Sequence, residues 1–269
     1  MAGVLYKINR WWTTGKVDPG FLFRTSRDEL GTIMSHMSER RILSLTGPRR
    51  VGKSTLLLQA VDKLLRNGVE PKRLLFFSGD EPAFLVGKIG LSSILDAYFE
   101  DVLNQAVEDI DSKTYIFIDE VHSLDDWQVH LKSFYDKRAD IKFIVSGSSA
   151  PRLFMDSRES LLGRIDDLYV LPLNLRQFAL FSCIYGDNSL DLEGFRHLLP
   201  AEKNRPFDEP GEYFESLWRS RHELNAYEAR FAGIVKDYLL AGGYPEYFET
   251  KNIAVWQKRL SGDVVQRGL

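Results

Sequence analysis

Cysteine is almost missing from this 269-residue chain, since Cys183 is the only one. A single cysteine cannot form an internal disulfide, which excludes the class of small disulfide-stabilised secreted domains. Cys183 lies in the apolar run FALFSCIYG, where we expect a small buried side chain. The five histidines form no ligand-spaced cluster with this cysteine, so the sequence predicts no metal site built on histidine and cysteine.

Long apolar runs and an excess of positive charge are missing too. No segment approaches the roughly 18 apolar residues that span a membrane, and the start, MAGVLYKINRWW, lacks the apolar core of a secretory signal. We therefore expect a soluble cytoplasmic protein with no membrane partner. The net charge is −3 and the isoelectric point is near 6.0. Dedicated DNA-binding domains usually have values above about 9, which argues against DNA binding as the main activity.

What is present is the alternation typical of an α/β protein. Five short apolar runs are nearly continuous, as in strands covered on both faces; they span residues 42–45, 74–77, 115–118, 143–145 and 168–171. Amphipathic stripes separate them and predict helices after Gly52, over 91–106 and from Trp127. The alternation predicts a parallel five-stranded sheet flanked by helices. Beyond Pro172 the pattern is helical, with helices expected over 175–185, 212–222 and 226–240.

A phosphate-binding loop follows the first predicted strand. GPRRVGKS, residues 47–54, fits the pattern G-x-x-x-x-G-K-[ST] between a strand and a helix. Glycines let the backbone N–H groups turn toward phosphates, and the helix N-terminus adds positive potential. We expect Lys53 to reach the β- and γ-phosphates and Ser54 to ligate Mg²⁺. The predicted nucleotide-binding residues are Gly47, Pro48, Arg49, Arg50, Val51, Gly52, Lys53, Ser54 and Thr55.

An acidic pair ends the third predicted strand, in YIFIDEVHSLDDW. The carboxyl ends of the strands are where open α/β sheets bind ligands. There Asp119 is suited to hold Mg²⁺. Glu120 is suited to take the proton of an attacking water, a role that raises the reaction rate about 10² to 10⁴-fold in typical enzymes. A kinase would take the proton from an acceptor hydroxyl and needs no glutamate here. The pair therefore favours hydrolysis over phosphate transfer.

Two further roles are predicted with an alternative beside each. A serine at the end of KFIVSGSSAP is expected to position the water, and we select Ser148 over Ser146 and Ser149; the alternative is that these residues only form a turn. An arginine before the fifth strand is expected to reach the γ-phosphate of a neighbouring subunit, which can be worth about 10³ to 10⁵ in rate. We select Arg164 over Arg152 and Arg158, the alternative being surface ion pairs.

The motifs GPRRVGKSTLL, IFIDEVHSLDDWQVHLKSFYD, IVSGSS, LLGRIDDLYVLPLNLRQF and AGGYPEYF together resemble a family of archaeal and bacterial AAA-superfamily P-loop ATPases, over residues 24–250. The resemblance implies ATP as the nucleotide, and a sheet in which the serine-bearing strand separates the P-loop strand from the strand of Asp119. It divides the chain into a lead-in (1–23), an AAA-type core (24–174), and a helical lid with the start of a truncated C-terminal region (175–269). It also places RTSRDEL (24–30) near the adenine, with Arg27 and Glu29 interpreted as surface charges.

The leading hypothesis is an Mg²⁺-dependent ATPase whose hydrolysis is coupled to a conformational change. One alternative is a slow nucleotide-dependent switch with little turnover, and another is a small-molecule kinase. A homo-oligomer with Arg164 acting between subunits, and a DNA or protein partner, are compatible with the sequence but not identified by it. The GGYP motif (242–245) has no role that follows from the residues.

Overall fold

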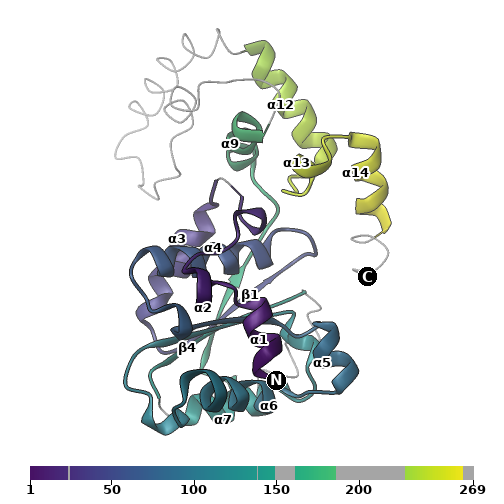
Figure 1. Ribbon diagram of the computed structural model, residues 1–269. Coiled ribbons are helices and arrows are strands. Elements are labelled where there is room, and N and C mark those ends of the chain that lie inside the picture. The colour runs from purple at the N-terminus through teal and green to yellow at the C-terminus, as the bar shows by residue number, and fades with distance from the viewer. Residues whose placement is uncertain (24, 138, 149–160, 186–227, 263–269) are drawn as a thin grey trace. The chain divides into compact units, whose positions relative to one another are not determined.

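The computed structural model of the protein describes residues 1–23, 25–137, 139–148, 161–185 and 228–262 (Figure 1). The chain divides into two compact units, Met1–Val170 and Leu171–Arg267. The helix predicted over 212–222 lies outside the described residues, as do Ser149, Arg152 and Arg158. In the part of the chain that is described, no helix combines the length and the apolar character needed to cross a bilayer.

The first unit contains the predicted parallel five-stranded sheet, with the strand order β2-β3-β4-β1-β5. Its strands are β1 (Ile42–Gly47), β2 (Leu74–Ser78), β3 (Thr114–Asp119), β4 (Ile141–Ser148) and β5 (Ile165–Tyr169). All four pairings are parallel. As expected, the serine-bearing strand β4 lies between β1 and β3, so the predicted α/β fold is confirmed.

The fifth strand differs from its prediction. It begins at Ile165, three residues before the expected start at Leu168, and its side chains are half-buried or exposed, with Tyr169 53% exposed. Among the described strands, β5 lies at the edge of the sheet and pairs with β1 alone. An edge strand tolerates the polar residues Asp166 and Asp167, because one of its sides has no neighbouring strand. The expectation of a strand covered on both faces is therefore wrong here.

Helices flank the sheet, with α3 and α4 on one side and α6 and α7 on the other (Figure 1). Between residue 19 and β1 lie η1 (Pro19–Phe21), α3 (Asp28–Ser35) and η2 (His36–Ser38). The helical elements of this unit after the P-loop are α4 (Lys53–Arg66), η3 (Pro71–Arg73), α5 (Pro82–Gly87), α6 (Leu91–Ala97), η4 (Tyr98–Leu103), η5 (Val107–Asp109), η6 (Val121–Ser123) and α7 (Trp127–Asp136). The helices expected after Gly52 and from Trp127 are confirmed. The single helix expected over 91–106 is not: α6 passes into the wider π-helical turn η4, and the chain leaves it at Asn104 with φ 53°.

Two short helices at the N-terminus, α1 (Ala2–Ile8) and α2 (Trp11–Thr14), cover the other edge of the sheet. The indole N–H groups of Trp11 and Trp12 both donate to the Leu74 carbonyl, at 3.0 and 2.9 Å. The Asn9 side chain accepts a hydrogen bond from the Phe76 backbone N–H at 2.7 Å. These contacts satisfy outward-facing backbone groups of the edge strand β2, which would otherwise be free to pair with another chain.

The second unit is helical. Its described helices are α9 (Leu175–Tyr185), α12 (Glu228–Ala241), α13 (Tyr247–Thr250) and α14 (Ile253–Leu260), so the helix expected over 175–185 is confirmed and the one over 226–240 is confirmed within two residues. Phe178 of α9 stacks with aromatic rings of α12 and α13, including Phe248 at 4.8 Å between ring centroids. Cys183 is half-buried rather than fully buried, and this burial raises the pKa of its thiol to about 11.

Candidate functional site

The P-loop joins β1 to α4 at the carboxyl edge of the sheet. Its chain reverses through left-handed conformations at Arg50 (φ 65°) and Gly52 (φ 95°). At Gly47 a side chain is excluded, because a Cβ atom would lie 2.2 Å from the Val170 carbonyl oxygen. Lys53 is 5% exposed, and its Nζ donates to the carbonyls of Gly47 and Pro48, both at 2.9 Å. The loop thus curls around the ammonium group, as expected for a cradle that holds phosphate.

The remaining predicted nucleotide-binding residues differ in how far they are buried. Val51 is buried and anchors the loop, whereas Arg49 is exposed and Arg50 is half-buried. Ser54 is exposed in the first turn of α4, and Thr55 follows it half-buried. Ser54 is therefore exposed at the N-terminal end of α4, where the helix dipole favours a negative ligand such as phosphate.

The acidic pair lies beside this loop. Burial lowers the pKa of the Lys53 ammonium, and the negative charges of Glu120 and Asp119 oppose that shift. Asp119 is 5% exposed at the end of β3, and the Ser146 hydroxyl of β4 donates to its Oδ1. The fold therefore brings Asp119 at the end of β3 and Glu120 in the turn after it within electrostatic reach of Lys53 at the start of α4.

Glu120 sits in a strained turn. Its backbone is left-handed, with φ 44° and ψ 45°, which costs a non-glycine residue about 1 kcal/mol or more and is common at functional sites. The segment after β2 packs directly against this turn: the Gly79 N–H donates to the Asp119 carbonyl at 2.8 Å, and a Cβ at Gly79 would lie 2.6 Å from the Glu120 carbonyl oxygen. Gly79 is not among the residues predicted from the sequence, where its signal is a glycine just beyond a strand.

The electrostatic surroundings of Glu120 are compatible with the proton-accepting role predicted for it. Burial raises the pKa of its carboxyl, and the neighbouring Asp119 charge raises it further, while His122 and Lys53 act in the opposite direction. His122 Nδ1 lies 3.4 Å from Glu120 Oε2. A carboxylate with a raised pKa holds a proton more readily than an ordinary glutamate, which suits a general base.

Among the side chains that the structure describes, the serine that contacts the acidic pair is Ser146. Ser146 is fully buried; it donates to Asp119 Oδ1 and accepts a hydrogen bond from the Glu120 backbone N–H at 3.4 Å. The backbone of Ser148 pairs with Gly47 at the end of β4 and so lies next to the P-loop; its side chain lies outside the described part of the structure. The role predicted for Ser148 stays a prediction.

Arg164 lies at the opposite edge of the sheet. Its carbonyl accepts a hydrogen bond at 2.8 Å from Ile42, the first residue of β1, whereas the P-loop begins at the last. A parallel strand rises about 3.3 Å per residue, so Arg164 is remote from the P-loop of its own chain. Its Nε pairs with Asp136 at 3.1 Å. The predicted action on another subunit stays a prediction.

Arg27 corrects a sequence-based expectation. It is 5% exposed and not a surface charge, and its Nη1 donates to the Val51 carbonyl of the P-loop at 2.6 Å. Its Nη2 forms an ion pair with the half-buried Glu29, also at 2.6 Å. Gln59 of α4 holds the same segment by donating to the carbonyls of Phe23 and Thr25, at 3.4 and 3.0 Å. The residues before α3 are thus fastened to the P-loop and to α4.

Known proteins resemble this chain over half of its length or more. Uncharacterized protein MJ1637 of Methanocaldococcus jannaschii is 27% identical over 222 residues, which are 82% of this chain and 41% of that protein. An uncharacterized protein of Haemophilus influenzae is 26% identical over 136 residues, which are 50% of this chain and 32% of that protein. The chain therefore spans less than half the length of these relatives.

Two solved structures resemble the fold. One, a DNA replication initiation factor, has a TM-score of 0.45 at 14% identity and covers 84% of this chain and 70% of its own. The other is the Hsp104–ADP complex of S. cerevisiae, with a TM-score of 0.47 at 20% identity. The match covers 66% of this chain and 26% of the Hsp104 chain. The likeness concerns the fold alone, and no function is transferred from it.

The family match is more direct. Residues 39–179 match a family described as an AAA domain. This range holds all five strands, the P-loop and the acidic pair, and it is just over half of the chain. The chain belongs to the AAA domain family.

Proposed function

We propose that this chain binds ATP with Mg²⁺, hydrolyses it, and couples the hydrolysis to a conformational change. The observation that carries the proposal is the convergence of Lys53, Asp119 and Glu120 at the carboxyl edge of the sheet. A phosphate cradle alone would fit a protein that only holds nucleotide. An acidic pair within electrostatic reach of the cradle's lysine is what hydrolysis adds to it.

The donor set suits Mg²⁺. Mg²⁺ prefers oxygen ligands and keeps several waters, so one hydroxyl and one carboxylate are a sufficient protein contribution. The exposed Ser54 hydroxyl and the Asp119 carboxylate are the residues that would hold it. When bound, the ion neutralises charge on the phosphate oxygens. Ser146 would keep the Asp119 carboxylate in one orientation through its hydrogen bond to Oδ1.

The chain's own groups then divide the work. Lys53 offsets negative charge on the β- and γ-phosphates. Glu120 orients the attacking water and takes its proton, helped by the raised pKa of its carboxyl. The preference for ATP over other nucleoside triphosphates is supported by the AAA domain match.

The test is the Glu120→Gln variant of the full-length protein. It should bind ATP like the parent and release phosphate about 10² to 10⁴ times more slowly, because the amide cannot accept the proton. Fluorescent-nucleotide binding and a phosphate-release assay measure the two properties separately. Lys53→Ala should lose ATP binding, and Glu100→Gln, an exposed glutamate of η4, should behave like the parent.

Equal turnover in Glu120→Gln and the parent would rule out Glu120 as the base. Tight ATP binding by the parent with negligible phosphate release would instead favour a nucleotide-dependent switch. Phosphate found on an acceptor molecule rather than as inorganic product would favour a kinase.

A further inference from the structure

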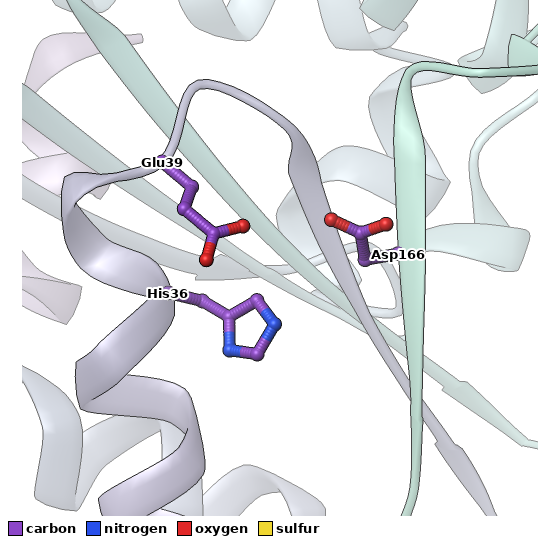
Figure 2. A group of neighbouring side chains, drawn as sticks. All are labelled: His36, Glu39 and Asp166. Atoms are coloured by element: carbon purple, nitrogen blue, oxygen red, sulfur yellow. The ribbon is translucent and has the colours of Figure 1, made fainter.

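A second group of ionisable side chains meets at the amino edge of the sheet, away from the P-loop. His36 opens η2, Glu39 follows that turn, and Asp166 lies in β5 beside Leu43. One possible ligand atom from each lies within 4.8 Å of the others. Figure 2 shows the two carboxylates and the imidazole converging on one small region. Asp166 is 127 residues beyond Glu39 (166 minus 39), so no sequence spacing reveals this group.

The orientation of His36 is set by its backbone partner. Its Nδ1 lies 2.8 Å from the Thr32 carbonyl oxygen. A carbonyl only accepts, so Nδ1 must carry the proton, and the neutral ring keeps its lone pair on Nε2. Metal-binding histidines typically have this arrangement, in which one ring nitrogen donates to a carbonyl and the other is free to ligate.

Two cations compete for the carboxylates. Arg41 Nη1 pairs with Asp166 Oδ1 at 2.6 Å. Lys142, buried at 1% exposure, donates to the Arg41 carbonyl and lies within the electrostatic reach of Glu39 and Asp166. Neutralising these cations explains the two carboxylates, but it gives no reason for the fixed imidazole beside them. Each carboxylate also has two oxygens, so a pairing through Oδ1 leaves Oδ2 of Asp166 for another partner.

We infer that His36, Glu39 and Asp166 bind a divalent transition-metal ion, for which Zn²⁺ is the best chemical fit. One imidazole nitrogen with two carboxylate oxygens is a donor set that Zn²⁺ accepts readily, with water completing the coordination. Mg²⁺ prefers oxygen ligands alone, so this site is separate from the one proposed beside the P-loop. A bound ion would link η2 to the edge strand β5, and the inference does not depend on ATP hydrolysis.

The experiment uses Zn²⁺ alone as the probe. The chain is stripped with a chelator and titrated with Zn²⁺ against a chromophoric competitor, in the presence of excess Mg²⁺. The parent should take up one Zn²⁺ and unfold at a higher temperature with it than without it. His36→Ala and Glu39→Gln should each weaken binding by about 10-fold or more, since even residues that only orient a ligand contribute that much. His130→Ala, on α7, is the matched control and should bind like the parent.

Two results would overturn the inference. One is a parent that takes up no stoichiometric Zn²⁺; the other is unchanged affinity in both ligand variants. Either would leave the cluster as counter-ions of Arg41 and Lys142. Glu39 is exposed, so Glu39→Gln should fold like the parent, and thermal unfolding without metal verifies this for each variant.

Discussion

Arg27 carries a positive charge into the interior of the first unit, where a guanidinium needs partners to offset lost hydration. Burial lowers the pKa of this guanidinium, and its ion pair with Glu29 opposes that shift. A second contact goes to the Val51 carbonyl, in the middle of the P-loop. The shape of the cradle is thus tied to a residue that lies 24 positions before Val51 in the chain.

Replacing Arg27 by lysine should weaken ATP binding. Lysine keeps the charge but not the planar fork that reaches Val51 and Glu29 together. Loss of one hydrogen bond from a charged donor is worth about 1.5 kcal/mol or more, which corresponds to about 10-fold in ATP affinity. Nucleotide titration measures this, with Arg66→Lys as the control because the Arg66 side chain is 75% exposed on α4. If Arg27→Lys lowers only the melting temperature and leaves ATP affinity intact, Arg27 is structural and does not shape the loop.

At the scale of elements, the GGYP segment shows why two glycines follow α12. Gly242 and Gly243 both have left-handed backbones, with φ 71° and 74°. The Gly243 carbonyl accepts a hydrogen bond from Leu173 N–H at 2.7 Å, and a Cβ on Gly243 would lie 2.4 Å from the Leu173 carbonyl oxygen. The motif that the sequence left without a role therefore fastens the turn after α12 to the segment that leads into α9.

Gly243→Ala should destabilise the protein by about 1 to 3 kcal/mol, since it adds both a steric clash and an unfavourable backbone angle. Urea unfolding measures the change. Gly233→Ala is the matched control: this glycine lies in α12 with nothing within 4 Å of an added Cβ. Alanine is preferred over glycine in a helix by about 1 kcal/mol, so the control should be neutral or more stable. Equal stability of the two variants would contradict this account of the turn.

At the scale of the whole molecule, the position of Arg164 bears on whether the protein assembles into a homo-oligomer. Arg164 lies far from the P-loop of its own chain and pairs with Asp136 on the outer part of the first unit. If it completes the site of a neighbouring subunit, as the sequence predicts, hydrolysis requires a homo-oligomer.

The ATPase rate per subunit should therefore rise with protein concentration, and Arg164→Ala should lower the rate of the assembled protein by about 10³-fold or more. Phosphate release measured over a concentration series tests both statements. Asp136→Asn removes the partner of Arg164 but keeps the arginine, so it should retain the dependence on concentration. A rate per subunit that stays constant in the parent would exclude action between subunits.

The sequence by itself determined the sheet and most of the site proposed to bind phosphate. Both are encoded locally: β1 to β4 are apolar runs, and Gly47 to Thr55 and the pair Asp119 and Glu120 are short contiguous motifs. The early start of β5 escaped prediction because an edge strand need not be apolar.

Only the tertiary structure decided which distant residues meet. Arg27 reaches Val51, Ser146 reaches Asp119, and the cluster of His36, Glu39 and Asp166 joins segments far apart in the chain. These contacts depend on strand order and helix placement, and neither is contained in the local pattern around any one of the residues. Burial, which shifts the pKa values of Lys53 and Glu120, arises in the same way from elements that pack around them.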